Sequence, residues 1–345
     1  MLISRRYFMG LISAGFVSGT LAAFRPEADG QRGAVPGQTL VDALIDSNTG
    51  SSVVVEAQRR TYTASATVML FSVPLVSRSG VGSGYTLIEQ ATTPGGALVS
   101  IQFGAGSYPE TAHGLNRLGL IHEVVLEPPG GAPRECAYYA FMTTSQETSL
   151  SQAKKAVENQ GASVPYVAAQ GRATGGVCAA RVERMQLPSH YTWRNADTLL
   201  RRLRAQLAGW PVPSDGFRGE AATFLYAVRR AMLDPQQRTA ANLFFNTKRF
   251  TLATEKERDP STGHRLANRK LVAAAESVMR LKATLQDRST GQKTLFQLWY
   301  EAGSGGPPLR FEYQPRGFLR LAFEVSKDAQ APPVTFALKR PDAAA

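Results

Sequence analysis

Residues 62–103 read YTASATVMLFSVPLVSRSGVGSGYTLIEQATTPGGALVSIQF, and this stretch decides the fold class. It contains three runs with partial alternation between apolar and polar residues and with many Val, Thr and Tyr, as is typical of β-strands. These runs are Tyr62–Phe71, Gly80–Gln90 and Ala97–Phe103. Turns at Pro74–Ser79 and Thr93–Gly96 separate them. Because connections this short cannot contain a parallel crossover, the sequence predicts an antiparallel meander.

The same texture continues on both sides of this stretch, with predicted strands at Val53–Ala57, Leu118–Glu127 and Cys136–Thr143. The middle of the chain is different and predicts helices. They cover Ser149–Gln160, Trp193–Ala208 and Glu220–Leu233. In the last of these, apolar residues recur at helical spacing, which is typical of a helix with one buried face.

The last third returns to β-strands, which we predict at Phe250–Glu255, Phe296–Tyr300 and Phe318–Val325. Residues Asp259–Gly263 read as a turn. Residues Leu271–Asp287 fit a helix by their alanines and a strand by the alternation in their second half.

We therefore predict an α+β protein that is mostly antiparallel β, a curved sheet or half-barrel, with a central helical insertion. The two β portions would form one curved sheet around the helices. The predicted segments are an export signal (1–24), a linker and lead-in segment (25–50), an N-terminal β portion (51–145), a mixed helical segment (146–235), a C-terminal β portion (236–326) and a loose tail (327–345).

Residues 4–10 read SRRYFMG and resemble the twin-arginine export signal, with paired arginines followed by Phe and an apolar residue. An uncharged, moderately apolar stretch follows from Met9 to Phe24, as in the apolar region of a signal segment. It is short for a membrane-spanning helix. We expect a periplasmic or secreted protein, with an uncleaved signal that anchors it to the inner membrane as the alternative.

The composition excludes several classes of protein. Of the 345 residues 43% are hydrophobic, which is enough for a core, and two cysteines are too few for a disulfide-dense scaffold. The net charge of +12 is spread along the chain, so we expect no nucleic-acid partner. An anionic membrane surface is a possible partner. The candidate anion-binding residues are Arg78, Arg201 and Arg204, and a solvated helix face is the alternative for the last two.

The cysteines, Cys136 and Cys178, would lie in an oxidising compartment if the chain is exported. They are candidates for a disulfide. Two inert buried thiols, or a reactive thiol, are the alternatives that the sequence leaves open.

Residues 296–301 (FQLWYE) lead through a Gly/Pro turn into residues 308–313 (PLRFEY). With the preceding helix, this region, about residues 218–325, resembles bacterial cell-envelope proteins of unknown function. Those proteins have a curved antiparallel sheet similar in shape to lipoprotein-carrier half-barrels. The family has a Leu-Pro-Leu-Arg sequence where this chain has Pro307-Pro308-Leu309-Arg310. The resemblance implies a fold, an envelope location and an apolar ligand, and it supplies no catalytic residues.

Aromatic residues recur on the strands of this region, and alternate ones could line the concave face of a curved sheet. The candidate ligand-binding residues are Trp299, Phe311, Tyr313 and Phe323. Ordinary core packing against the helices is the alternative interpretation.

Patterns that carry catalysis are weak in this sequence. The glycine-rich residues 80–84 precede a strand rather than a helix, so they indicate a turn or β-bulge more than an anion-binding loop. His113 and His122 match no metal-ligand spacing, so we expect no metal and no cofactor. There is no Gly-x-Ser-x-Gly elbow of a serine hydrolase.

The function that these features predict is that of a non-enzymatic envelope protein that binds an apolar or amphipathic ligand such as lipid. The first alternative is a secreted hydrolase, for which a Ser or an acidic residue would be hydrogen-bonded to His113 or His122 in a cleft. The second is a structural or partner-binding module, which would expose a flat apolar patch.

Overall fold

The structure is a computed structural model that describes eleven parts of the chain. They are residues 53–70, 73–93, 95–130, 133–143, 155, 163–174, 176–196, 198–199, 217–218, 222–316 and 319–329. The expected export signal and linker lie outside these residues. So do most of the helices expected at 149–160 and 193–208, and the end of the tail.

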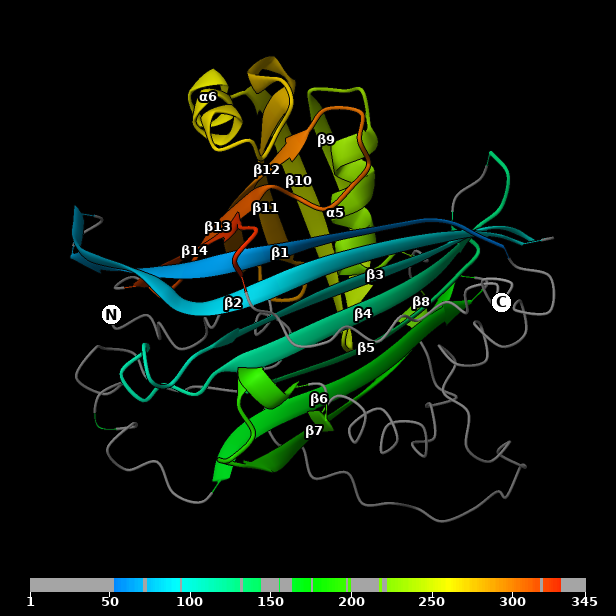
Figure 1. The fold of residues 1–345 in the computed structure, drawn as a ribbon. Helices are drawn as coiled ribbons and strands as arrows, with labels where there is room; N and C mark the ends of the chain where they lie inside the picture. Colours follow the sequence, from blue (N-terminus) through cyan, green and yellow to red (C-terminus); the bar gives the residue numbers. More distant parts are fainter. Residues whose placement is uncertain are drawn as a thin grey trace, which may run out of the picture.

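Across these residues the chain forms one antiparallel sheet of fourteen strands, in the order β8-β7-β6-β5-β4-β3-β2-β1-β14-β13-β12-β11-β10-β9 (Figure 1). The strands are β1 (Val53–Leu70), β2 (Val73–Thr93), β3 (Gly96–Ser107), β4 (Leu118–Glu127), β5 (Glu135–Thr143), β6 (Ser163–Thr174), β7 (Val177–Pro188), β8 (Phe217–Arg218), β9 (Arg238–Phe245), β10 (Lys248–Arg258), β11 (Val278–Asp287), β12 (Lys293–Glu301), β13 (Arg310–Arg316) and β14 (Leu319–Val325). The predicted antiparallel meander is confirmed.

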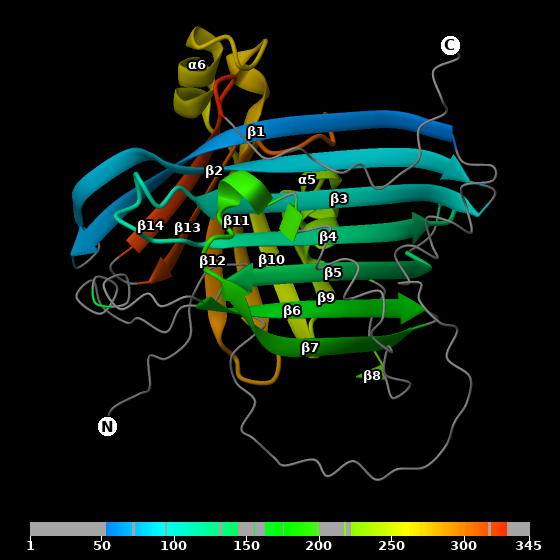
Figure 2. The ribbon, with the colours of Figure 1, turned by 60° about the horizontal axis from the view of Figure 1, so that its bottom comes forward.

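Pairing between β1 and β14 joins the two β portions into one sheet. We call β1–β8 the N-terminal half-sheet and β9–β14 the C-terminal half-sheet. The sheet coils so that β9–β12 cross the face of the N-terminal half-sheet, and it makes a nearly closed barrel (Figures 1 and 2). Tyr138 on β5 bridges the two halves, because its hydroxyl accepts from the backbone N–H of Asn246, beyond β9, and donates to the Asn246 side chain over 3.3 Å.

Helix α5 (Phe224–Leu233) packs inside the coiled sheet, between its two halves. The inward-facing residues of both half-sheets form a single apolar cluster with this helix. Its members include Ile88, Val99, Ile121, Tyr138, Met142, Val228, Met232, Phe244, Leu281, Phe296 and Leu298. Burial of so much apolar surface around one short helix is what fixes the helix in place.

The opposite face of the N-terminal half-sheet is also buried in part. Trp193, in the 3-10 turn η1 (Trp193–Asn195), is fully buried and stacks on Tyr85 with its ring centroid 6.1 Å away. Its indole N–H donates to the hydroxyl of Ser83 over 2.8 Å. Gly106 on β3 packs against Trp193, and a Cβ at position 106 would lie only 2.5 Å from the Trp193 side chain. The strand therefore needs glycine at this position.

Several sequence predictions need correction. The expected turn at Asp259–Gly263 is the start of helix α6 (Pro260–Asn268). The predicted strand at Val53–Ala57 and the described part of the one at Tyr62–Phe71 belong to a single long strand, β1, which ends at Leu70. The ambiguous segment Leu271–Asp287 contains the short turn η2 (Ala275–Ser277), followed by β11. Among the described residues, no helix is long and apolar enough to cross a membrane.

The helix predicted at Glu220–Leu233 is present as α5, which begins at Phe224. Gly80 has φ of 72° and lies where the register of β1 with β2 shifts, between the pairs Ala64–Gly82 and Ser65–Ser79. Because glycine adopts this conformation without strain, the glycine-rich residues 80–84 make the β-bulge that the sequence indicates.

Candidate functional site

An apolar cavity of about 100 Å³ lies between α5 and the inner face of the barrel. It is lined by Thr86, Ile88, Ile101, Phe103, Ile121, Phe224, Leu225, Val228, Arg229, Met232, Phe296, Leu298, Gly306, Pro308, Phe311 and Tyr313. The volume is smaller than that of most drug-sized ligand pockets, about 300–1,000 Å³, and similar in order to cavities that bind one small hydrocarbon. A few methylene groups fit without rearrangement.

Helix α5 contributes five of these residues, and the spacing of four of them explains how. Leu225, Val228, Arg229 and Met232 occupy the i, i+3, i+4 and i+7 positions, which share one face of a helix. Met232 is unbranched and flexible, so this wall of the cavity can adapt to the shape of a ligand.

The cavity has two distinguishable ends. At the first turn of α5, the ring of Phe224 contacts that of Phe296 at 5.9 Å between centroids, and Tyr313 pairs with Phe296 across the strands. At the other end, Arg229 lies beside the loop that joins β12 to β13, where its Nε donates to the carbonyl oxygen of Gly305 over 3.3 Å. The apolar space therefore leads from an aromatic end to an arginine.

A buried carboxylate holds the N-terminus of α5. Glu123 on β4 points into the barrel with no exposed surface. It accepts from the Thr223 hydroxyl and, over 2.9 Å each, from the backbone N–H groups of Leu225 and Tyr226. A carboxylate at this place satisfies donors that a helix leaves unpaired and complements its dipole. Burial nevertheless raises the pKa of Glu123 to about 7, against the lowering effect of these hydrogen bonds.

A second contact joins the same strand to the helix, because the hydroxyl of Tyr226 donates to Glu127 over 2.5 Å. Burial, the main cause, and this bond to the carboxylate raise the pKa of Tyr226. β4 thus positions α5 through two acidic side chains four residues apart.

The loop that joins β12 to β13, at the end of the cavity where Arg229 lies, is also held by hydrogen bonds. The hydroxyl of Tyr62 on β1 donates to the carbonyl oxygen of Pro308 over 2.8 Å and lies 3.1 Å from the hydroxyl of Thr86. Burial raises the pKa of Tyr62, so the phenol stays neutral. Arg60 also binds this region, through Glu301 and the carbonyl oxygen of Pro307.

Three of the four aromatic residues predicted from sequence to bind ligand lie at or near this cavity. Phe311 and Tyr313 line it. Phe323 lies behind them in a neighbouring cluster and stacks on Phe311, with centroids 4.6 Å apart and an interplanar angle of 13°. It supports the wall without lining the space.

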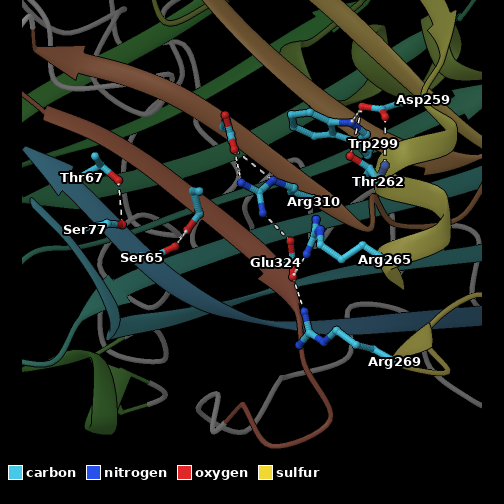
Figure 3. A network of polar contacts seen from close by, with 12 residues as sticks. Ser65, Thr67, Ser77, Asp259, Thr262, Arg265, Arg269, Trp299, Arg310 and Glu324 are labelled. Atoms are coloured by element: carbon cyan, nitrogen blue, oxygen red, sulfur yellow. Dashed lines mark hydrogen bonds and ion pairs between the residues drawn. The ribbon is translucent and has the colours of Figure 1, made fainter. Parts of the chain in front are cut away.

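Trp299, the fourth, does not belong to this site. It points to the other face of β12 from Leu298 and packs under α6 in a separate cluster. Its indole N–H donates to Asp259 over 2.8 Å, and Asp259 caps α6 through the backbone N–H of Thr262 (Figure 3). Trp299 thus packs in the core beneath α6, and it is not among the residues that line this cavity.

Figure 3 also shows how α6 is fastened to the barrel. Glu324 on β14 forms ion pairs with Arg265 and Arg269 of the α6 region and with Arg310 on β13. Burial alone would raise the pKa of Glu324, but Arg265 and Arg310 lower it to about 2. The network is structural and lies outside the cavity.

The predicted anion-binding arginines are not brought together at the cavity. Arg78 is exposed beside the β-bulge, where its guanidinium lies 2.9 Å from Nε2 of His113. Arg201 and Arg204 lie outside the described residues.

The candidate disulfide between Cys136 and Cys178 is not formed, and both side chains are buried thiols. In the sheet Cys136 pairs with Ala173, which in turn pairs with Cys178, so one strand separates them. At about 4.8 Å per strand their Cα atoms are about 10 Å apart, beyond the reach of a disulfide. Burial raises the pKa of Cys178 to about 11 and also raises that of Cys136 well above its usual range, which makes both poor nucleophiles.

His122 has a serine partner, as the hydrolase hypothesis requires, but the arrangement does not suit catalysis. The hydroxyl of Ser100 lies 3.1 Å from Nε2 of His122 and donates to Glu89 over 3.3 Å. All three side chains are fully buried, and the serine lies between the acid and the histidine. A triad needs the histidine in the middle and a nucleophile that substrate can reach. Within the described residues no three His, Cys, Asp or Glu side chains form a metal site.

Sequence reasoning missed the two charged residues that matter most here, Arg229 and Glu123. The sequence position of Arg229 does indicate that it faces the core, because it lies four residues after Leu225, within the apolar stripe of α5. Nothing in the local pattern distinguishes Glu123 from a surface residue, since its partners are a hundred residues away in sequence.

No protein-family model matches this chain, and no curated protein matches it. A solved structure with some likeness is the β-barrel-like protein of the domain of unknown function DUF1849 from Brucella abortus. The TM-score is 0.42 and the sequence identity 8%, over 80% of this chain and 97% of that chain. At this TM-score the likeness carries no argument about function.

Proposed function

We propose that this protein is an exported cell-envelope protein that binds an apolar or amphipathic ligand, such as a lipid, in the cavity beside α5. The observation that carries the proposal is the cavity itself, an apolar space inside the barrel with very few polar groups in its lining. Binding pockets for small molecules combine apolar walls with few, well-placed polar groups. Export is supported by the SRRYFMG sequence and the apolar stretch after it.

The size of the cavity limits what enters it. A space of about 100 Å³ takes part of one hydrocarbon chain, and the rest of the ligand extends past the loop at Gly305 and Gly306. Deeper entry requires Met232 to change rotamer, which its flexibility permits. We therefore infer a single-chain ligand, or one chain of a larger lipid.

An anionic membrane surface is part of the same proposal. The net charge of +12 favours approach to such a surface. β2 also leaves Leu75 and Val76 exposed, by 57% and 64%, near the end of its hairpin with β1, and the exposed Arg78 follows. Apolar side chains beside a basic residue suit contact with lipid headgroups.

The test is titration with N-phenyl-1-naphthylamine, a neutral probe whose fluorescence rises in apolar surroundings. We expect saturable 1:1 binding by the wild-type protein. Val228→Phe should abolish it, because the larger ring fills the cavity from α5. The matched control is Leu295→Phe, which adds the same ring at a position 68% exposed on β12. Failure of the wild type to bind, or equal binding by Val228→Phe, would overturn the proposal.

A further inference from the structure

Arg229 is the single charged side chain in the lining of the cavity, and it is only 8% exposed. Helices normally turn their arginines toward water, as α5 does with the neighbouring Arg230, which is exposed. Arg229 instead shares the apolar face with Leu225 and Met232. The sequence thus places a permanent positive charge at one end of an apolar space.

The guanidinium of Arg229 has little to neutralise it. Its one hydrogen bond within the described part of the chain is the 3.3 Å contact from Nε to Gly305, and no carboxylate there lies within ion-pair distance. Glu127 and Glu56 act on it only at longer range, and burial lowers its pKa. Buried charges in proteins are normally paired, because desolvation of a lone charge is costly. Neither terminal nitrogen is among the fully enclosed side-chain atoms that lack a partner, and the cavity wall itself is apolar. The guanidinium therefore reaches the surface at the rim of the cavity, where an anion can approach it.

The geometry of the helix relates this charge to the apolar space. Phe224, at the aromatic end, and Arg229 are five residues apart, which is about 7–8 Å along a helix axis. That length corresponds to several methylene groups. An amphiphile would fit both ends of the cavity. Its hydrocarbon chain would lie between α5 and the strands, and its anionic head would contact Arg229.

We propose that Arg229 binds the anionic headgroup, a carboxylate or a phosphate, of a single-chain amphiphile whose hydrocarbon chain enters the cavity. The guanidinium would bind the anion through its two terminal N–H groups in the bidentate mode that suits both headgroups. This inference rests on the proposed function, since it names the class of ligand for the same cavity.

The experiment measures displacement of N-phenyl-1-naphthylamine by amphiphiles with the same chain and different heads. These are dodecanoate, dodecyl phosphate, dodecanol and dodecyltrimethylammonium, each below its micelle concentration at pH 7.5. Inorganic phosphate and acetate are the anions without a chain. For the wild type we expect the two anionic amphiphiles to bind about tenfold more tightly than the alcohol, with the cation weakest. The free anions should displace no probe.

The variant Arg229→Met keeps the length of the side chain and removes its charge. We expect it to bind dodecanol as the wild type does and to lose the preference for anions. Arg229→Lys should retain part of that preference as a point charge. The matched control is Arg230→Met, which removes the same charge from the exposed face of α5 and should leave the tenfold preference unchanged.

The outcomes separate the two proposals. If no amphiphile displaces the probe, or the probe itself fails to bind, the proposed function fails. If the wild type binds acid and alcohol equally, or Arg229→Met keeps the preference, the assignment of Arg229 is wrong while the apolar site stands. If Arg230→Met loses the preference equally, the effect is one of net charge and the assignment is also wrong. Circular dichroism establishes that each variant is folded. If Arg229→Met does not fold, Arg229→Lys tests the assignment instead, through its reduced preference for anionic amphiphiles.

Discussion

Replacement of Glu123 by glutamine tests how α5 is held in the barrel. The pKa of this carboxyl rises from 4.5 to about 7 on folding, because burial outweighs its hydrogen bonds to the helix. Between these values the folded protein keeps a proton that the unfolded chain releases. The free energy of unfolding therefore contains a contribution that is complete below pH 4.5 and is lost as the pH rises through 7.

The size of this contribution follows from the two pKa values. At about 1.4 kcal/mol for each pH unit between them, the full effect is about 3 kcal/mol. Glutamine at position 123 resembles the protonated acid and does not titrate. The difference in stability between the wild type and Glu123→Gln should therefore shrink by about 2–3 kcal/mol from pH 5 to pH 8.

Urea denaturation followed by tryptophan fluorescence, at each pH unit from 5 to 8, measures this difference. Thr223→Val is the companion variant, because it removes a hydrogen bond that lowers the pKa of Glu123 and leaves the carboxyl in place. Its stability should continue to fall to a higher pH than that of the wild type, with a larger total loss. Parallel pH curves for the wild type and Glu123→Gln would show that the pKa of Glu123 does not rise on folding.

Three further predictions concern the scaffold. Gly106→Ala should lower the free energy of unfolding by about 1–3 kcal/mol in thermal melts and shift the emission of Trp193, because the new Cβ would overlap that side chain; an unchanged melting temperature would contradict the packing. Glu324→Gln should remove about 1–2 kcal/mol at pH 7 and less at pH 2, since the lowered pKa of Glu324 gives stability that is present above pH 4.5 and lost toward pH 2; equal losses at both pH values would count against the ion-pair network. Cys136 and Cys178 should both react with a thiol reagent in guanidinium without reductant and stay unreactive in the folded protein; no reaction after unfolding would mean that they form a disulfide.

The antiparallel sheet and the helix predicted at Glu220–Leu233, which is present as Phe224–Leu233, could be predicted because both depend on local periodicity. The alternating run Leu118–Glu127 and the run Cys136–Thr143 were predicted as strands, and they correspond to β4 and β5. Where periodicity is weak the predictions failed. Residues 259–263 contain turn-forming residues, yet Asp259 serves as the N-cap of α6, with Pro260 in the first turn. The pattern of a turn and that of a capped helix start are the same over these few residues.

The candidate site was predictable only in part. Alternation placed Phe311 and Tyr313 on one face of a strand, and both line the cavity. It could not say which face Trp299 takes, because Leu298, Trp299 and Tyr300 are all buried and the periodicity disappears. The roles of Glu123 and Arg229 depend on contacts between segments that are far apart in the chain.

The central claim is that the barrel binds an amphipathic ligand beside α5. The decisive test is native mass spectrometry, before and after denaturation, of protein purified from the cells that naturally produce it. We predict a stoichiometric extra mass in the lipid range that is lost on unfolding, present in Leu295→Phe and absent in Val228→Phe. A bare polypeptide mass for the wild type, or the same extra mass on Val228→Phe, would contradict the claim.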